Sequence, residues 1–99
     1  MYHQYSIAIY PLLRIVKRYN LNATHFFQLC QDYIRHQAVA LFDIELCRMD
    51  PVNWFMIKAE SITFLNQLIL EVDMTDNVVG AEFKNQQFVI YGDTNVPNQ

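Results

Sequence analysis

An aspartate and a histidine one helical turn apart come nearest to a chemical site in this sequence. Asp32 and His36 are four residues apart in a segment with helical periodicity, so both side chains are expected on one helix face. Such a pair could supply two metal ligands, but a structural metal site needs four and a catalytic one needs three. No third ligand is evident nearby. The pair therefore predicts no metal or other cofactor, and a small enzyme or ligand-binding pocket stays a second alternative function.

Two cysteines and a pair of acidic residues give weaker signals for catalysis. Cys30 is expected on an apolar helix face, where a thiol is usually inert. Cys47 would share a polar strand face with Asp43 and Glu45, whose negative charges disfavour a reactive thiolate. These carboxylates have the spacing of paired catalytic acids, but any polar strand face produces the same spacing. With only two glycines, the chain also lacks a glycine-rich phosphate loop. We predict that it is not an enzyme.

Hydrophobic periodicity predicts three helices that would position these residues. Apolar residues recur at three- and four-residue steps over residues 2–19, although Pro11 interrupts this helix and leaves a strand over 5–10 as the alternative. A second helix is predicted over 23–37, after a capping asparagine at position 22. A third helix is predicted over 60–72, where the helical period returns.

Two segments with a two-residue period predict strands. Apolar and polar residues alternate from residue 42, and Asp50-Pro51-Val52-Asn53 is typical of a turn, so a hairpin is expected over 42–59. A long helix beginning at Pro51 is the alternative, but it would place Lys58 in its apolar stripe. A second hairpin is expected from 78–83 and 87–91.

The expected fold is therefore α+β. Two N-terminal helices are followed by two antiparallel β-hairpins that flank a third helix, which packs on one face of a four-stranded sheet. Because 99 residues suffice for one core only, residues 1–92 are expected to form a single domain. The polar residues 93–99 are expected to form a flexible tail.

The composition predicts an apolar surface. Apolar residues make up 53% of the chain and charged residues 17%, compared with roughly 45–50% and about 25% in ordinary soluble domains. A domain this small leaves some large apolar side chains outside its core, so we expect a protein partner or a homodimer to cover them. No apolar run is long enough for a membrane span, and the N-terminus lacks signal-peptide features. Two cysteines are too few for a disulfide scaffold, so a cytoplasmic location is expected.

The net charge of −3 is unevenly distributed and suggests where a partner would bind. Residues 38–99 carry nine acidic and three basic residues, which would attract a basic partner. The leading hypothesis is a protein-binding module that acts as an inhibitor, adaptor or chaperone-like subunit, by class analogy with immunity or anti-defence proteins. Its predicted partner-binding residues are Asp43, Glu45, Trp54 and Met56.

Nucleic-acid binding is the alternative function. It would use a basic patch on the N-terminal helices, formed by Arg14, Lys17, Arg18 and Arg35. Phosphate contacts dominate the affinity of such proteins. Four basic residues in an acidic chain are weak support, so the sequence argues against a nucleic-acid partner.

Overall fold

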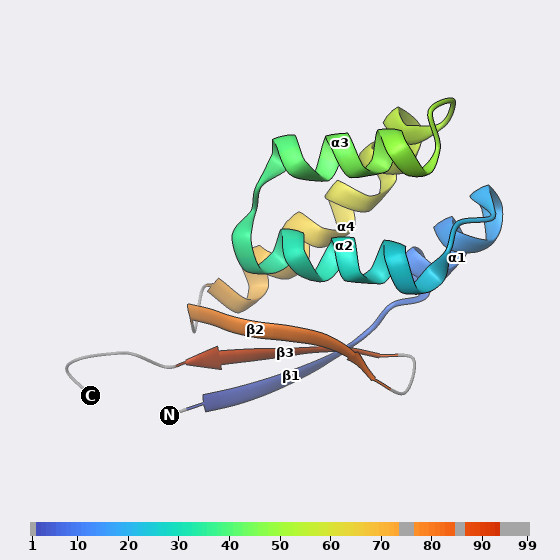
Figure 1. Cartoon of the computed structure of the whole chain (residues 1–99). Coiled ribbons are helices and arrows are strands. Elements are labelled where there is room, and N and C mark those ends of the chain that lie inside the picture. The colour runs from blue at the N-terminus through green and yellow to red at the C-terminus, as the bar shows by residue number, and fades with distance from the viewer. Residues whose placement is uncertain (1, 74–76, 85–86, 94–99) are drawn as a thin grey trace.

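Four helices lie over one side of a three-stranded antiparallel sheet (Figure 1). The structure is a computed structural model that describes the backbone of residues 2–73, 77–84 and 87–93 and the side chains of residues 9–70. The elements follow in the order β1 (Tyr2–Ala8), α1 (Tyr10–Tyr19), α2 (Ala23–His36), α3 (Val39–Met49), α4 (Trp54–Asp73), β2 (Asn77–Lys84) and β3 (Gln87–Asp93).

The sheet has the strand order β1-β3-β2, so the first strand of the chain lies beside the last. Both pairings of β3 are antiparallel. Tyr2 lies opposite Asp93 in the β1–β3 pair, and a register shift between Val78 and Gly80 interrupts the β2–β3 pair. Strand β1 therefore begins at the same end of the sheet at which β3 ends (Figure 1).

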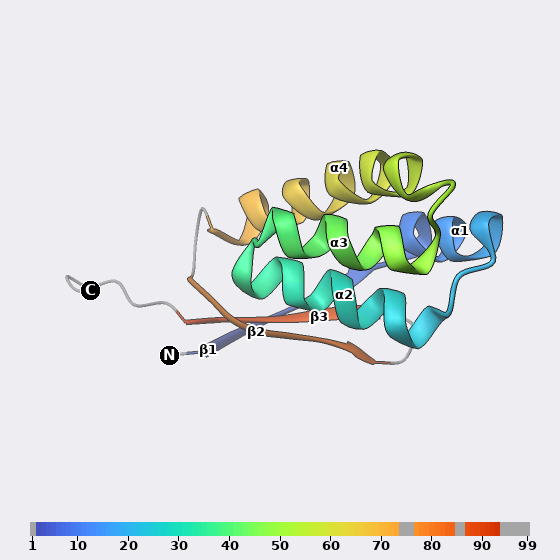
Figure 2. The same ribbon diagram turned by 45° about the horizontal axis from the view of Figure 1, so that its top comes forward.

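The helices are stacked at increasing distance from the sheet. Helices α2 and α4 both contact β2, and α3 contacts α2 and α4. Figure 1 shows α3 on the side of α2 that faces away from the sheet, and Figure 2 shows α3 alongside both of its helical neighbours. Helix α1 packs against α4 and the start of α2. Helix α3 and the turn that leads from it to α4 thus lie farthest from the sheet (Figure 1).

Local signals in the sequence explain where α1 and α2 begin and end. Pro11 occupies the first turn of α1, where its missing N–H is not needed. The side chain of Asn22 caps α2 by accepting a hydrogen bond of 2.9 Å from the backbone N–H of His25. Asn20 and Gln37 end the two helices in the left-handed conformation, with φ angles of 53° and 51°.

The inward faces of all four helices form one hydrophobic core. Ser61 is the buried polar residue among those described, and its hydroxyl donates to the carbonyl of Ile57 over 2.6 Å. The apolar core residues are Ile9, Leu12, Ile15, Phe26, Leu29, Cys30, Tyr33, Ile34, Phe42, Leu46, Ile57, Leu65, Leu68 and Ile69.

The predicted α+β arrangement with two hairpins around a four-stranded sheet is wrong. All regular structure in residues 9–70 is helical, and the segment predicted as the first hairpin forms α3 and the start of α4. Phe42 and Leu46 are buried and Met49 is partly buried, which is the four- and three-residue spacing of a helix. Ile44 is exposed, so its apparent alternation with Phe42 and Leu46 does not mark a strand.

The turn sequence at residues 50–53 begins a helix instead of reversing a hairpin. Asp50 Oδ1 accepts hydrogen bonds from the backbone N–H groups of Val52 and Asn53, at 3.1 and 2.9 Å. The carbonyl of Asp50 accepts from the N–H of Trp54 over 2.9 Å. The charge of Lys58 disfavours a helix here in the sequence analysis. In the structure, Lys58 is half-buried and donates to Asp43 of α3 over 3.0 Å. Asp43 of α3 therefore neutralises the charge of Lys58, so this lysine is compatible with a helix that begins near Pro51.

Two other predicted helices are present with different bounds. The helix expected over 23–37 is present as α2 and ends one residue earlier, and the helix expected over 60–72 is the later part of the longer α4. The helix expected over 2–19 is wrong for its first part, because residues 2–8 form β1 and only residues 10–19 are helical. The second hairpin, expected from 78–83 and 87–91, is present as the antiparallel pair β2–β3. The tail predicted over 93–99 lies, apart from Asp93, outside the described residues.

Candidate functional site

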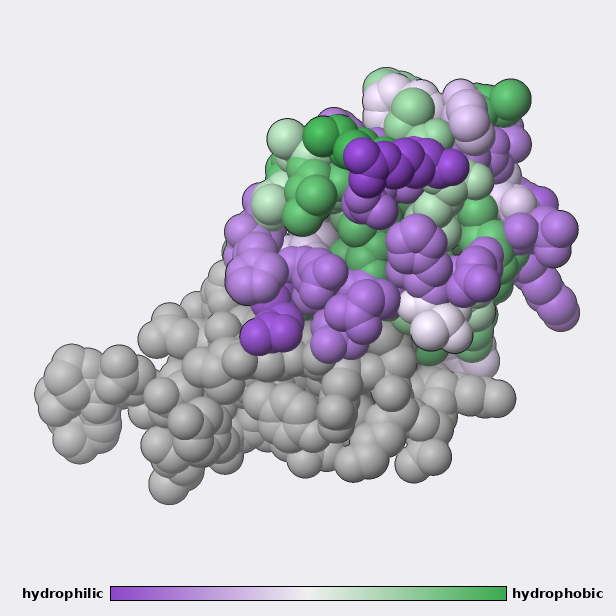
Figure 3. Space-filling model, in the orientation of Figure 1, coloured by the Kyte–Doolittle hydropathy of each residue, from purple (hydrophilic) through white to green (hydrophobic). Residues whose placement is uncertain are grey.

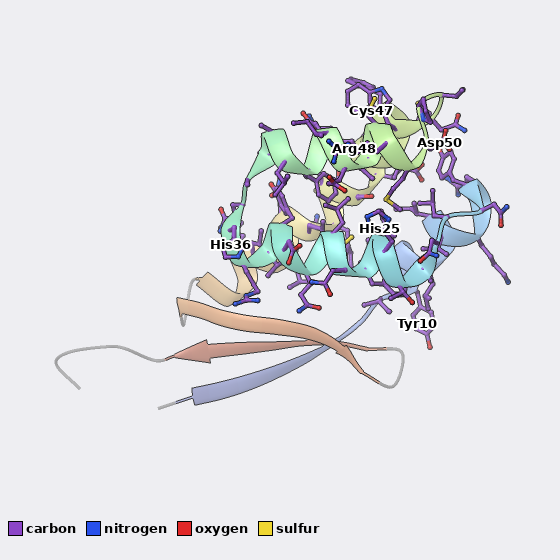
Figure 4. All side chains as sticks on the ribbon, viewed as in Figure 1. Tyr10, His25, His36, Cys47, Arg48 and Asp50 are labelled. Atoms are coloured by element: carbon purple, nitrogen blue, oxygen red, sulfur yellow. The ribbon has the colours of Figure 1, made fainter. Side chains whose placement is uncertain are left out.

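One stripe of α2 faces α3 and carries polar residues at both of its ends. At the first end, His25 Nε2 lies 3.5 Å from Glu45 Oε2, and Arg48 donates to the other oxygen of Glu45 over 2.7 Å. Figure 4 shows His25 on the side of α2 toward α3, below Arg48. Glu45 is thus held between a residue of α2 and a residue one turn further along α3.

A half-enclosed pocket lies at the other end of this stripe. Its volume is about 180 Å³. The rings of Tyr33 and Phe42 in its wall are 5.2 Å apart and tilted by 56°, and the hydroxyl of Tyr33 donates to Asn66 Oδ1 of α4 over 2.8 Å. These contacts fix the wall in place. The lining residues of this α2–α3 pocket are Leu29, Asp32, Tyr33, His36, Ala38, Leu41 and Phe42.

The α2–α3 pocket brings together the Asp32–His36 pair that the sequence singled out. Both residues line it, one turn apart on α2. Asp32 Oδ1 accepts a hydrogen bond from Gln28 over 3.2 Å, and Figure 4 shows His36 at the end of α2 far from α1. In the part of the chain whose side chains are described, no three His, Cys, Asp or Glu residues are placed to hold a metal ion. The arrangement combines apolar walls with a carboxylate and an imidazole, which suits binding of a polar-tipped apolar group.

A second feature is the exposed apolar surface of the α3–α4 hairpin. Eight large apolar side chains are exposed among the residues with described side chains, and six of them lie between positions 39 and 56. Figure 3 shows hydrophobic surface over the start of α3 and near the turn that leads to α4. We call these residues the α3–α4 apolar surface: Val39, Leu41, Ile44, Val52, Phe55 and Met56.

The predicted partner-binding residues do not form one face. Asp43 is half-buried against Lys58 of α4, and Glu45 is half-buried on the opposite side of α3, toward α2. Trp54 packs partly against the core, and its ring meets that of Phe55 edge-on with centroids 5.6 Å apart. Met56 is the one of the four that is exposed, and it belongs to the α3–α4 apolar surface.

Sequence reasoning missed most of that surface. The sequence pattern predicts a hairpin strand at Ile44 and at Phe55, and a turn at Val52. On a helix, however, Ile44 falls off the stripe formed by Phe42 and Leu46. An apolar residue off the buried stripe of an amphipathic helix is the signal that could have identified this surface.

The structure keeps three residues of the predicted basic patch, Arg14, Lys17 and Arg18, together on α1 and places the fourth, Arg35, apart on α2. Arg18 bonds Glu60 of α4 over 2.5 Å, and Glu60 also accepts from the hydroxyl of Tyr19 over 2.9 Å. The hydrogen bond to Glu60 and its negative charge raise the pKa of Arg18, so this guanidinium already has a carboxylate partner. Arg14 is exposed on α1, whereas Arg35 is in the last turn of α2. Twelve residues of α2 separate Arg35 from the end near α1, a distance of about 18 Å at 1.5 Å per residue.

The two cysteines are free and differ in environment. Cys30 is buried in the core, and burial raises the pKa of its thiol far above the usual range. Cys47 is exposed on the outer side of α3 (Figure 4). Cys30 therefore has the surroundings of an inert packing residue.

The described helices include none that is both long and apolar enough to span a membrane. In comparisons with known proteins, no family model matches the chain, and neither a curated protein nor a solved structure shows significant similarity to it.

Proposed function

We propose that this protein is a small protein-binding module, an inhibitor, adaptor or chaperone-like subunit, and that the α3–α4 apolar surface is its interface. One observation carries the proposal: six of the eight exposed large apolar side chains among the described residues lie within residues 39–56, on α3, the turn after it and the first turn of α4. Scattered exposed apolar residues are normal on a protein surface, whereas a concentration of them marks an interaction site.

The residue types of this surface support a protein interface. Phe55 and Met56 are of the types enriched in interfaces, where aromatic and methionine side chains act as anchors. The hairpin that presents them is anchored to the hydrophobic core, because its inner residues Phe42, Leu46 and Ile57 are buried there. A rigid presenting surface loses little conformational freedom on binding, which favours affinity.

The proposed partner is a different protein and not a second copy. The chain carries a net charge of −3, so two copies would repel each other weakly, whereas a basic partner would be attracted. A binding role without catalysis and a cytoplasmic location are parts of the same proposal. The free thiols of Cys30 and Cys47 are compatible with a reducing compartment.

The test compares two substitutions on the same helix. Phe55 and Leu70 are equally exposed, each at 65%, but only Phe55 belongs to the α3–α4 apolar surface. Tagged wild-type protein, Phe55→Glu and Leu70→Glu are expressed in the native host, and the co-purifying proteins are quantified by mass spectrometry. We expect a partner that is reduced at least tenfold by Phe55→Glu and retained by Leu70→Glu.

Two results would overturn the proposal. In the first, every protein that co-purifies with the wild type also co-purifies with Phe55→Glu. In the second, analytical ultracentrifugation shows a homodimer that Phe55→Glu dissociates, because the surface would then be occupied by a second copy. Circular dichroism of each variant checks that the helices are retained.

A further inference from the structure

The α2–α3 pocket has the size of a single side chain. Its volume is about 180 Å³, and a cavity of about 150 Å³ is enough to hold a benzene ring. Pockets for drug-sized ligands are larger, on the order of 300–1,000 Å³. The walls formed by Leu29, Tyr33, Leu41 and Phe42 are apolar or aromatic. The pocket therefore suits one aromatic or branched aliphatic group.

The surroundings of the pocket favour a polypeptide over a free small molecule. Leu41 lines the pocket and is itself about half exposed, and Val39 and Ile44 are exposed on the same helix. A small molecule that filled the pocket would leave Val39 and Ile44, which do not line it, in water. A protein segment that inserted one side chain would cover them at the same time, and would bury more apolar area.

A carboxylate at the pocket adds a preference for positive charge. Asp32 is half-exposed, and its Oδ1 accepts a hydrogen bond from the uncharged side chain of Gln28 over 3.2 Å. It forms no ion pair within the part of the chain that the structure describes. Asp43 and Glu45, by contrast, are both paired with basic side chains. Asp32 is therefore available to pair with a lysine or arginine of a bound segment.

We infer that the α2–α3 pocket receives one aromatic or aliphatic side chain of the protein partner, and that Asp32 pairs with an adjacent lysine or arginine of the same segment. This inference rests on the proposed function and extends it from an apolar surface to a sequence preference. The recognised segment has an apolar anchor residue next to a basic residue. Its anchor fills the pocket while its flanks cover Leu41 and its exposed neighbours.

Blocked dipeptides test this preference directly. N-acetylated, C-amidated Phe-Lys, Phe-Glu and Ala-Lys are titrated into ¹⁵N-labelled protein and followed by NMR. We expect Phe-Lys to bind with a Kd of about 1–10 mM, as suits so small a ligand, and to shift the amide signals of Leu29, Asp32 and Phe42. Phe-Glu and Ala-Lys are expected to bind at least fivefold more weakly.

Three variants and a small-molecule control locate the binding. Ala38 lines the pocket, so Ala38→Leu should fill it and abolish binding of Phe-Lys, whereas Ala40→Leu on the exposed face of α3 should leave the Kd unchanged within twofold. Asp32→Asn should remove the preference for Phe-Lys over Phe-Glu. If 2-phenylethylamine binds more tightly than Phe-Lys, or if the two charged dipeptides bind equally, the inference is overturned.

The partner identified by co-purification separates this inference from the proposed function. If both Phe55→Glu and Ala38→Leu lose that partner, the result supports the proposed function and the pocket inference. If Ala38→Leu retains the partner that Phe55→Glu loses, the pocket inference is overturned and the proposed function stands. If the dipeptides bind as expected but no partner depends on Phe55, the proposed function is overturned. Circular dichroism spectra and Tm values of Ala38→Leu and Ala40→Leu show that each variant is folded.

Discussion

Lys58 is a charged residue in the apolar stripe of α4, and its position depends on one carboxylate. Its Nζ lies 3.0 Å from Asp43 Oδ2 and 2.9 Å from Asp43 Oδ1. The two side chains are 27% and 30% exposed, so the pair is neither fully buried nor a freely hydrated surface pair. Removing one member would leave the other partly desolvated without a partner.

A double-mutant cycle measures this pair. Asp43→Ala is expected to lower the free energy of unfolding by about 1–2 kcal/mol, between the values typical of surface and buried pairs. The double variant Asp43→Ala/Lys58→Met is expected to lose roughly 1 kcal/mol less than the sum of its two single variants. Urea denaturation at pH 7 gives all four free energies. Additive losses would show that the two residues do not stabilise the helix pair together.

The two thiols should react very differently with an alkylating reagent. Cys47 is exposed and Cys30 is buried with a raised pKa, and only the thiolate reacts. In native protein at pH 8, iodoacetamide is expected to modify Cys47 at least 100-fold faster than Cys30. Mass spectrometry of the digested protein measures both rates. Equal alkylation rates of the two cysteines are expected in urea. Equal rates in the native protein would contradict the burial of Cys30.

At the scale of elements, α3 and α4 show why the sequence misled. Phe42, Ile44 and Leu46 alternate with acidic residues, which is the pattern of a half-buried strand. In the structure only Phe42 and Leu46 are buried, and Ile44 is exposed. Periodicity assumes that every apolar residue faces the core. An exposed apolar residue on a short helix therefore produces a false two-residue period.

The C-terminal residues of α1 and α2 provide a matched test of helix termination. Asn20 and Gln37 both have φ near 50°, a conformation that costs most residues about 1–2 kcal/mol but is tolerated by asparagine. Gln37→Gly is expected to stabilise the protein by about 0.5–1 kcal/mol, whereas Asn20→Gly should change stability by less than about 0.5 kcal/mol. Thermal and urea denaturation of the two variants measure both changes in stability. A destabilised Gln37→Gly would show that its side chain contributes more than its backbone strain costs.

The start of α4 should make stability depend on pH through Asp50. Hydrogen bonds from the backbone N–H of Asn53, its side-chain amide and the N–H of Val52 lower the pKa of Asp50. A lowered folded-state pKa stabilises the fold above the unfolded-state value of about 3.9, and this contribution is lost as the pH falls through the folded-state pKa. Asp50→Ala is therefore expected to lower the urea midpoint at pH 7 and to have a smaller effect at pH 3.

Asp50→Asn is the control for this prediction. Asparagine still accepts hydrogen bonds at a helix start, so this variant should retain more of the stability at pH 7 than Asp50→Ala does. Its stability relative to the wild type should also improve between pH 7 and pH 3, because it has no proton to gain at this position. An equal loss for Asp50→Ala at both pH values would contradict the role of the charged form.

For the whole molecule, the sequence predicted the candidate site in part. The Asp32–His36 pair was identified by its spacing on a correctly predicted helix, and the structure places both residues at the α2–α3 pocket. The pocket itself depends on Leu41 and Phe42 of a helix that was predicted as a strand. The parts of the fold that the sequence did not predict depend on contacts between residues far apart in the chain. Lys58 fits α4 because Asp43 faces it, and no local pattern in either segment reports that contact.

The surplus of apolar residues in the composition leads to a prediction about the molecule as a whole. Val52, Phe55 and Met56 are 86%, 65% and 57% exposed, so replacing all three by serine should remove surface hydrophobicity with little loss of stability. We expect a loss of about 1 kcal/mol, mainly from the edge contact between Phe55 and Trp54. Retention on a phenyl column should fall clearly below that of the wild type.

A double variant from other parts of the chain is the control. Tyr10→Ser/Leu70→Ser removes exposed apolar side chains that lie outside the α3–α4 apolar surface. Because retention depends on contiguous apolar area more than on single residues, this variant should shift retention less than the triple serine variant does. If the triple variant instead loses more than about 3 kcal/mol in urea denaturation, the three side chains are packed within the fold. They would then not be available to a partner, and the apolar surplus of this chain would serve its stability.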